Sequence, residues 1–409
     1  MAIRVVRPLA GGVAALAVLL AVAPSALAGP TPPPPPPAGA VLDQVLAARG
    51  GDVPGTEYRE FTTTVAAGRV RGHVVRVDLR NPGLAVVLLR SPVVTATATV
   101  PDLAGRVGAI AGVNGDFFDE GGSGAPVGAE LSGGVPLTSA VVPGRRPAPP
   151  GPPGSDPDTV LGIDASGAAR IDTVRFAGTV TTAGAPLALS GLNTYAVPVG
   201  GIAAFTPGWG AAPRTRTVCG SDTDPHAPCS PDTVEVVVRD GRVAASGPVG
   251  TAAVPTGAVA LVGRDRGADA LRGLRVGDRA VPHWELRASG TPALRTALGV
   301  LPLARGGAPW PGLQDTERAP RTAVGLSADG RTLALVAVDG RQQASVGLTL
   351  AQLGRLVVEL GWPQAVALDG GGSTQMVRRP AGGTLGVVNT PSDMPLRRVR
   401  DGVGVVPAR

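Results

Sequence analysis

Residues 349–374, TLAQLGRLVVELGWPQAVALDGGGST, combine the helix and strand signals that decide the fold class. Thr349 and Gln352 have the spacing of a capping box, and Gly361 supplies a helix stop. The apolar residues 365–368 then predict a short strand. The positions that share one face of the predicted helix are Leu350, Leu353, Val357 and Leu360.

Strand-like runs dominate the rest of the chain. Asp-Gly pairs at 240–241, 329–330 and 339–340 follow several of these runs, as expected of hairpin turns. We therefore expect fold class α+β, with a strand-rich, mostly antiparallel sheet core, a few helices, and one large domain of one lobe or two. The runs that predict strands are 69–79, 84–89, 233–239, 254–262 and 332–338.

Composition narrows the class of protein. The chain has 409 residues with 60 Gly and 42 Pro, a fraction near the range of disordered proteins, but its Val, Leu and Ala runs can build a core. All 37 basic residues are Arg, which indicates a compositional bias, so the high isoelectric point says little about partners. No basic block follows the N-terminal segment, and nucleic acid is not an expected partner.

The N-terminal segment has the layout of a secretory signal peptide. Arg4 and Arg7 precede an apolar run over 9–23 and the small-residue pattern of 26–28, so we expect cleavage near Ala28. Residues 29–39, with six consecutive prolines, predict a stiff tether, and 40–409 form the expected domain. The apolar run is too short to span a membrane, so the protein should be secreted to the extracellular side without a transmembrane segment.

Cys219 and Cys229 are the two cysteines, and both lie in the polar segment CGSDTDPHAPC. Export favours an oxidised pair, so we predict a disulfide that staples this loop. The three histidines, His73, His226 and His283, are scattered, and zinc is not expected here. The metal requirement and cofactors of the protein as a whole stay unknown.

The segment ALDGGGST, residues 367–374, places an acid, three glycines and two hydroxyl residues at the end of a strand. Consecutive glycine N–H groups can form an anion-binding nest, and Ser373 and Thr374 add donors. A flexible turn after a strand is the alternative. No Gly-Lys-Ser/Thr sequence follows, so the segment is not a P-loop.

Two further segments hold polar residues that suit a site. Residues 112–119, GVNGDFFD, set two of the five phenylalanines beside an asparagine and two acids, although Asn-Gly is also a common hairpin turn. Residues 320–325, PRTAVG, begin a hairpin that ends in VDGR at 338–341. Arg321 and Arg341, with Asp339 near them, could clamp a phosphate or carboxylate, or they are ordinary surface charges.

Taken in order, these segments resemble the phosphodiester glycosidase family. The patterns of the commonest serine hydrolases and zinc proteases, Gly-x-Ser-x-Gly and His-Glu-x-x-His, are absent. Asp116 departs from the commonest family form, which has a second glycine there, and adds a carboxylate. The resemblance spans residues 65–406 and rests on VNGDFFD, RTAVG with VDGR, GLTLAQLGRLVVELGW leading into ALDGGGSTQM, and the closing PSDMPLRRVRDGVGVV.

This resemblance implies hydrolysis of the glycosidic bond between an N-acetylglucosamine-like sugar and a phosphodiester. Asp369 would act as base or water-orienting group, the Arg pair would bind phosphate, and Asn114 with Asp339 would contact the sugar or its water. The expected catalytic residues are Asp369, Asp339 and Asp116; the expected substrate-binding residues are Asn114, Arg321, Thr322, Arg341, Gly370, Gly371, Gly372, Ser373 and Thr374.

Two other classes compete with the hydrolase. A secreted carbohydrate-binding module would use exposed aromatic residues, of which this chain has few: 4 Trp, 2 Tyr and 5 Phe. A cell-envelope adhesion protein would explain export and the proline tether, but it would not need an acid beside three glycines. Release of free sugar from a sugar-1-phosphate diester separates these classes. The natural sugar and aglycone cannot be read from the sequence.

Overall fold

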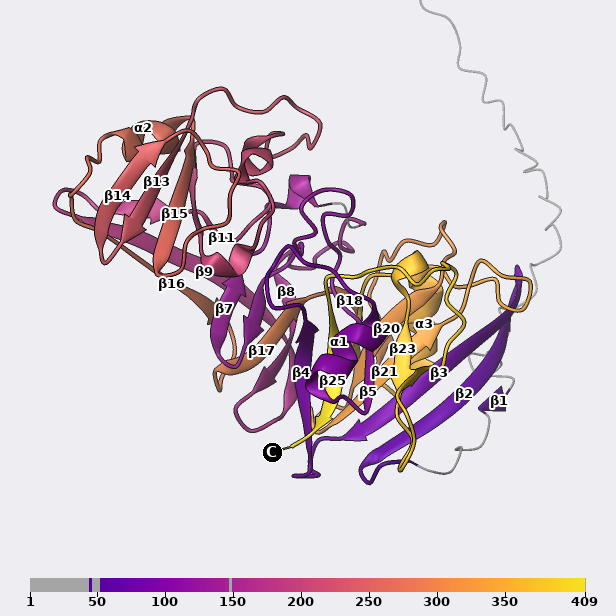
Figure 1. Ribbon diagram of the computed structural model, residues 1–409. Helices are drawn as coiled ribbons and strands as arrows, with labels where there is room; N and C mark the ends of the chain where they lie inside the picture. Colours follow the sequence, from indigo (N-terminus) through magenta and orange to yellow (C-terminus); the bar gives the residue numbers. More distant parts are fainter. Residues whose placement is uncertain (1–43, 46–51, 147–148, 409) are drawn as a thin grey trace, which may run out of the picture. The chain divides into compact units, whose positions relative to one another are not determined.

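Four β-sheets form the framework of the described chain (Figure 1). The computed structural model describes residues 44–45, 52–146 and 149–408, all of which fall in one unit of contacts, Gly39–Arg409. The predicted signal peptide, 1–28, and tether, 29–39, lie outside the described residues. Every strand pairing among these residues is antiparallel except that of β11 (Gly191–Leu192) with β12 (Ile202–Phe205).

The largest sheet has eight strands and holds two of the predicted site segments. Its inner strand β21 (Thr332–Val338) is buried along its whole length between β3 and β20, which explains a continuous apolar run without alternation. In order, the sheet is β1 (Gln44–Val45), β2 (Thr56–Val65), β3 (Gly68–Asp78), β21, β20 (Arg321–Leu326), β22 (Gln364–Ala367), β18 (Leu301–Arg305) and β19 (Ala308–Pro309).

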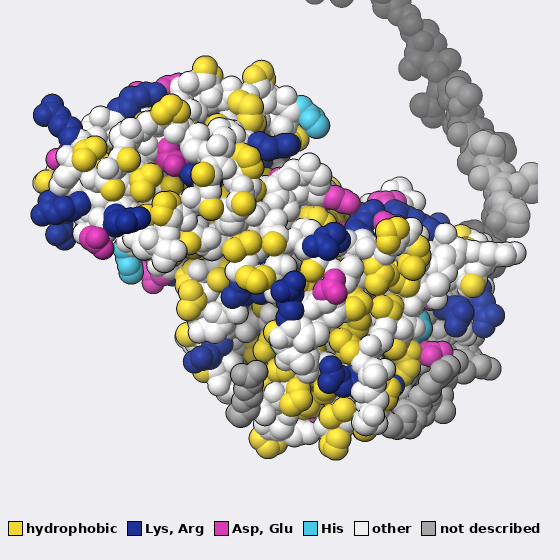
Figure 2. Space-filling model, in the orientation of Figure 1, with side chains coloured by type: hydrophobic (Ala, Val, Ile, Leu, Met, Phe, Trp, Pro, Cys, Tyr) yellow, Lys and Arg dark blue, Asp and Glu magenta, His cyan; other side chains and the backbone are white. Residues whose placement is uncertain are grey.

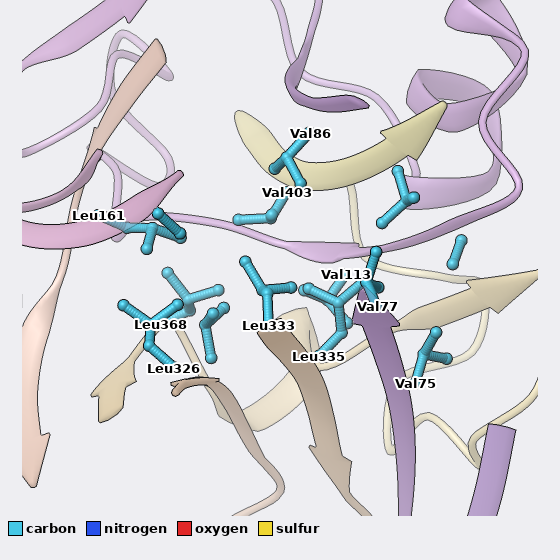
Figure 3. Close-up of a cluster of buried hydrophobic side chains, with 14 of the residues drawn as sticks. Val75, Val77, Val86, Val113, Leu161, Leu326, Leu333, Leu335, Leu368 and Val403 are labelled. Carbon is cyan, nitrogen blue, oxygen red and sulfur yellow. The ribbon is translucent and has the colours of Figure 1, made fainter. Parts of the chain in front are cut away.

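A five-stranded sheet shares the main hydrophobic core with the eight-stranded sheet. Figure 3 shows Val113 and Val403 of the smaller sheet close to Leu333 and Leu335 of the larger one. Val113 and Leu368 directly precede predicted site residues, so packing of this core fixes the strand ends that carry them. In order, the sheet is β24 (Gly386–Val387), β23 (Met376–Arg378), β5 (Ala111–Asn114), β25 (Asp401–Pro407) and β4 (Leu84–Arg90).

Two more sheets are formed by the middle of the chain. One follows the order β10 (Leu187–Leu189), β9 (Ala169–Thr182), β8 (Thr159–Asp164), β17 (Leu294–Gly299), β6 (Glu130–Ser132) and β7 (Val135–Thr138), with β16 (Ala280–Ala288) paired to β9. The other follows the order β11, β12, β15 (Ala258–Arg264), β13 (Thr233–Arg239) and β14 (Arg242–Gly247).

Three α-helices occur among the described residues: α1 (Val100–Val107), α2 (Arg266–Arg272) and α3 (Leu350–Glu359). The predicted capping box of α3 is confirmed, because Thr349 Oγ1 accepts from the Gln352 N–H and the Gln352 side chain accepts from the Thr349 N–H. The apolar face of α3, which includes Leu353 and Val357, is buried in a core shared with β18 and β22.

The strand-rich, mostly antiparallel core is confirmed, but the α+β class overstates the helix content, and the described fold is dominated by strands. The predicted turn at Asp339-Gly340 is also corrected. Asp339 is 1% exposed, and Gly340 packs against Pro320 and Gly347, so the pair leads away from the sheet instead of joining two neighbouring strands. A turn signal read from Asp-Gly alone does not show whether the next strand is adjacent.

The lengths of the helices and the distribution of the arginine side chains both bear on the sequence-based expectations. No helix among the described residues is long and apolar enough to cross a membrane. Arg side chains, dark blue in Figure 2, are scattered over the displayed face and do not gather into one continuous stripe.

Candidate active site

The predicted site segments meet where β5, β20 and β22 lie close together. The Asp369 N–H donates to the Gly115 carbonyl at 2.8 Å, and the Leu368 N–H donates to the Thr322 carbonyl at 3.0 Å. Segments more than 200 residues apart along the chain therefore share one set of hydrogen bonds.

Asn114 is the side chain that ties these segments together. It is fully buried, its Nδ2 donates to the Asp369 carbonyl at 2.7 Å, and its Oδ1 accepts from Thr322 Oγ1 at 2.7 Å. The same Oδ1 accepts from the Gln375 N–H at 3.2 Å, and Thr322 Oγ1 also lies 3.3 Å from Thr374 Oγ1. The hydrogen bonds of the Asn114 side chain all go to other groups of the protein. This arrangement suits a role in positioning Asp369.

The glycine run forms a tight turn around Gly371–Ser373 instead of the expected open nest. Gly371 has a φ of 58°, which favours glycine. Its N–H donates to the Pro320 carbonyl, and the N–H groups of Ser373 and Thr374 donate back into the run. The Gly370 N–H donates to Asp369 Oδ1 at 2.8 Å. Four of these N–H groups are thus engaged by protein acceptors, which leaves little of an anion-binding nest.

The two arginines predicted to bind phosphate do lie at this run. Arg321 is buried, its Nε donates to the Leu348 carbonyl at 2.9 Å and its Nη2 to the Glu317 carbonyl at 2.7 Å. Burial lowers the pKa of Arg321, with Glu317 opposing that shift. A Cβ placed on Gly370 would lie 3.7 Å from Nη1 of Arg321, and one on Gly371 would lie 3.2 Å from Nη1 of Arg341.

Arg341 is the more exposed arginine of the pair, with about half of its side-chain surface accessible to solvent. Its Nη2 lies 3.7 Å from Glu317 Oε1, a distance that leaves a weak surface ion pair. Arg341 has a φ of 57°, unusual for a residue other than glycine. The backbone of 340–341 thus turns in a way that brings this guanidinium to Gly371.

Asp369 has the chemistry of a group that titrates near neutral pH. Burial raises the pKa of Asp369 to about 6, while Ser373, the Gly370 N–H and Arg397 lower it and Glu120 raises it further. Arg397 is itself paired with Asp393 at 2.7 Å and with Glu120 at 2.9 Å. A carboxyl group with such a pKa can exchange a proton during a reaction at physiological pH.

Asp339, the second predicted catalytic residue, is enclosed. Its Oδ1 accepts from the Thr390 N–H at 2.8 Å, and its Oδ2 lies 3.5 Å from Nε2 of His73. Nδ1 of His73 is 2.9 Å from the Tyr58 hydroxyl. Since both carboxylate oxygens face protein groups and the residue is 1% exposed, Asp339 is placed to hold the 390 loop against β21.

Asp116, the third predicted catalytic residue, contacts a different set of residues. Its Oδ2 accepts from the Gly128 N–H at 2.6 Å and its Oδ1 from the Phe117 N–H at 2.8 Å. Burial raises the pKa of Asp116 to about 7, with Glu130 adding to the rise and Arg146 opposing it. It borders a cavity of about 170 Å³ that Arg146 and Gly299 also line.

A buried charge cluster was missed by the sequence analysis. Arg400 Nη2 donates to Glu130 Oε2 at 2.8 Å, and Asp401 Oδ1 accepts from the Asp116 N–H at 2.8 Å. Glu130, Arg400 and Asp401 are all fully buried. The segment RRVRDG was part of the resemblance. Its local sequence gives no sign that Arg400 pairs with Glu130, which lies 270 positions away. Arg397, Glu120 and Asp393 around Asp369 were missed for the same reason.

The remaining predictions concern metals and the disulfide. Within the described ranges, no group of three or more His, Cys, Asp or Glu side chains could hold a metal ion. The predicted disulfide is confirmed, with Cys219 and Cys229 bonded at an S–S distance of 2.01 Å.

Part of the chain matches a known family. Residues 232–406 match the phosphodiester glycosidase family, which confirms the resemblance over that part of the chain; the VNGDFFD motif at 113–119 lies outside the match. No curated protein sequence matches the chain.

Two of the solved structures that match share the fold. A hypothetical protein from Synechocystis has a TM-score of 0.66 and 21% identity, over 86% of this chain and 62% of its own. A protein from Burkholderia pseudomallei has a TM-score of 0.63 and 24% identity, over 83% of this chain and 74% of its own. The catalytic domain of zebrafish N-acetylglucosamine-1-phosphodiester alpha-N-acetylglucosaminidase has a TM-score of 0.44 and 15% identity, over 88% of this chain and 86% of its own. We transfer no residue from that third structure.

Proposed function

Because residues 232–406 belong to the phosphodiester glycosidase family, we propose that the protein is a secreted hydrolase of sugar-1-phosphate diesters. The bond cleaved is the glycosidic bond between the sugar, N-acetylglucosamine-like, and the phosphodiester. The observation that carries this proposal is the Asp369 carboxyl group, with a pKa of about 6, at the start of a glycine run whose Gly370 and Gly371 lie against the guanidinium groups of Arg321 and Arg341.

The proposed reaction uses these groups as follows. A water molecule attacks the anomeric carbon while Asp369, ionised, accepts one of its protons. The bond between the anomeric carbon and the phosphate oxygen breaks, and its electron pair leaves with the phosphate, which becomes a phosphate monoester. Nη1 of Arg321 and the Arg341 guanidinium stabilise the charge that develops on that group. Because a phosphodiester leaves readily, no strong acid is required.

The surrounding polar residues have supporting roles in this proposal. Asn114 and Thr322 fix the backbone of Asp369 through two hydrogen bonds of 2.7 Å. Asp339 and Asp116 hold loops next to the site in this proposal, because protein groups engage both oxygens of each carboxylate. The glycines of the run allow Pro320, Arg341 and Asp393 to pack closely against the backbone beside Asp369.

Export forms part of the proposal. A disulfide between Cys219 and Cys229 is expected of a protein that matures in an oxidising compartment. The Met1–Ala28 segment supplies the expected leader. N-terminal sequencing of the secreted protein should give a chain that begins after Ala28, and a mature chain that begins at Met1 would contradict export.

The proposed activity is tested with a sugar-1-phosphate diester of N-acetylglucosamine. Asp369→Asn keeps the size of the side chain and removes its charge, so release of free sugar should fall by roughly 10²-fold or more, while the melting temperature stays close to that of the parent. The matched control is Asp240→Asn, in an exposed turn with a φ of 50° that asparagine tolerates, and it should keep full activity.

Two results would contradict the proposal. Absence of sugar release by the parent protein would remove this hydrolase activity, and parent-like turnover by a folded Asp369→Asn variant would remove Asp369 from the mechanism.

A further inference from the structure

A second cavity, which the proposed reaction does not use, has more cationic than anionic side chains in its lining. It has a volume of about 640 Å³, and Tyr195 and the disulfide Cys219–Cys229 form part of its wall. Its charged and titratable lining consists of Arg145, Arg146, Arg216, His226 and Asp119. Three guanidinium groups thus face one carboxylate. We call it the Arg145 cavity.

Arg145 is the unusual residue of this lining. Its residue surface is 7% exposed, and neither its Nε nor its Nη1 has a hydrogen-bond partner. Burial lowers the pKa of Arg145, and the nearby Arg264 lowers it further. A buried guanidinium with unsatisfied N–H groups is costly for a folded protein. Nε and Nη1 are closed off from solvent, but Nη2 is not among the closed-off atoms and makes no hydrogen bond within the described residues, so Nη2 is the nitrogen that can donate to an anionic ligand in the cavity.

The chain holds Arg145 firmly in this position. The Tyr195 hydroxyl donates to the Arg145 carbonyl at 2.9 Å. Gly220, at a φ of 75°, lies against the guanidinium so closely that a Cβ there would be 2.6 Å from Cζ. Gly220 belongs to the disulfide loop, whose Asp222 backbone packs on Gly144. The disulfide loop and the Pro143–Arg145 turn therefore pack around the Arg145 side chain and fix its position.

The other charges of the lining leave the cavity positive. Asp119 is occupied, since its Oδ2 accepts from both the N–H and the hydroxyl of Ser123, at 2.7 and 2.8 Å. Arg146 is paired with Asp158 at 2.8 Å. Arg216 is exposed and has no ion pair among the described residues. Arg145 and Arg216 are thus the two cations available to a ligand.

We propose that the Arg145 cavity is a binding site for the phosphate group of a small phosphate monoester. Two guanidinium groups match the charge of a dianion and its several acceptor oxygens. A volume of about 640 Å³ leaves room for the organic part of the ligand beside the phosphate. This site does not depend on the chemistry proposed for Asp369.

The test is calorimetric titration of the full chain with inorganic phosphate. The parent should bind, and Arg216→Gln should weaken binding at this site about tenfold, the effect expected of losing a charged hydrogen bond. Arg145→Gln should weaken it at least as much. Arg275→Gln, at an exposed position outside the cavity, is the matched control and should bind as the parent does.

If Arg145→Gln fails to fold, the result for Arg216→Gln decides the test, because the exposed Arg216 side chain can be replaced without loss of packing. Parent-like phosphate affinity in a folded Arg216→Gln variant would overturn the proposal, since the ion would then bind elsewhere. No binding by the parent at millimolar phosphate would also overturn it, and so would equal affinity for acetate, which would indicate a general anion site. None of these results depends on sugar release.

Discussion

At the scale of single residues, the raised pKa of Asp369 predicts how activity depends on pH. If ionised Asp369 accepts a proton from water, kcat/KM should fall about tenfold per pH unit below pH 6, because the carboxyl group has a pKa of about 6. Initial rates between pH 4 and 8 would show the acid limb. A limb near pH 4, the range of an ordinary aspartate, would contradict the role.

Asn114 supports a second residue-scale prediction. Asn114→Ala leaves the Gln375 N–H without its acceptor, removes the nearer acceptor of Thr322 Oγ1 and frees the Asp369 carbonyl, so kcat should fall about tenfold or more with little change in KM. Asn389→Ala is the matched control. Asn389 is also a buried amide bonded to backbone, at Met376 and Thr374, and its loss should cost similar stability without the same loss of kcat.

The comparison of the two variants separates positioning from folding. If both lose the same fraction of kcat and the same melting temperature, Asn114 acts only through stability. If Asn114→Ala alone changes kcat, the amide acts through Asp369.

At the scale of elements, β6, β25 and the loop after β5 enclose a pair of carboxyl groups. Burial raises the pKa of Asp401 well above its usual range, and Glu130 raises it further. Glu130 Oε1 and Asp401 Oδ2 are buried and receive no hydrogen bond. A proton held on Asp401 would supply the missing donor.

Asp401→Asn should therefore stabilise the protein. The Asn Oδ1 keeps the bond from the Asp116 N–H, and its Nδ2 supplies the donor without titrating. Above neutral pH the free energy of unfolding should rise by about 1 to 3 kcal/mol, measured by denaturant unfolding at pH 8. A variant less stable than the parent at that pH would show that the ionised form is the one the fold requires.

Elements differ in how far sequence alone predicts them. Helix α3 and strands β13 and β21 were predicted closely because capping, apolar faces and turns are local patterns. The gathering of Asn114, Arg321 and Asp369 was predicted from their motifs and is seen in the hydrogen bonds. The closed glycine turn, the enclosure of Asp339 and Asp116, and the buried Arg400 depend on tertiary packing, which gives no signal in nearby sequence.

At the scale of the whole molecule, two sets of buried acids have shifted pKa values, and they contribute stability in opposite pH ranges. Asp116 and Asp369 have pKa values raised to about 7 and about 6, and that of Asp401 is also raised. Their native forms bind protons more tightly than the unfolded chain, so the stability they contribute is complete below pH 4 and is lost as the pH rises through 6 and 7.

Ion pairs and hydrogen bonds lower the pKa values of a second group, which includes Asp164 and Asp172. Hydrogen bonds from Ser166 and Arg170 contribute to those shifts, although burial opposes them. The stability that this group contributes is present above pH 4 and is lost as the pH falls through the lowered values. The two groups leave a window near pH 4 to 5 in which both contributions are present.

The melting temperature should therefore be higher at pH 5 than at pH 8, and it should fall again below pH 4. Calorimetry in buffers of constant ionic strength measures this curve, and Asp401→Asn should flatten its neutral side because one raised acid no longer titrates. A curve that rises steadily from pH 5 to pH 8 would mean that these buried carboxyl groups are ionised in the native protein at little cost. Asp369 would then have the pKa of an ordinary aspartate, and there would be no reason to expect kcat/KM to fall as the pH drops below 6.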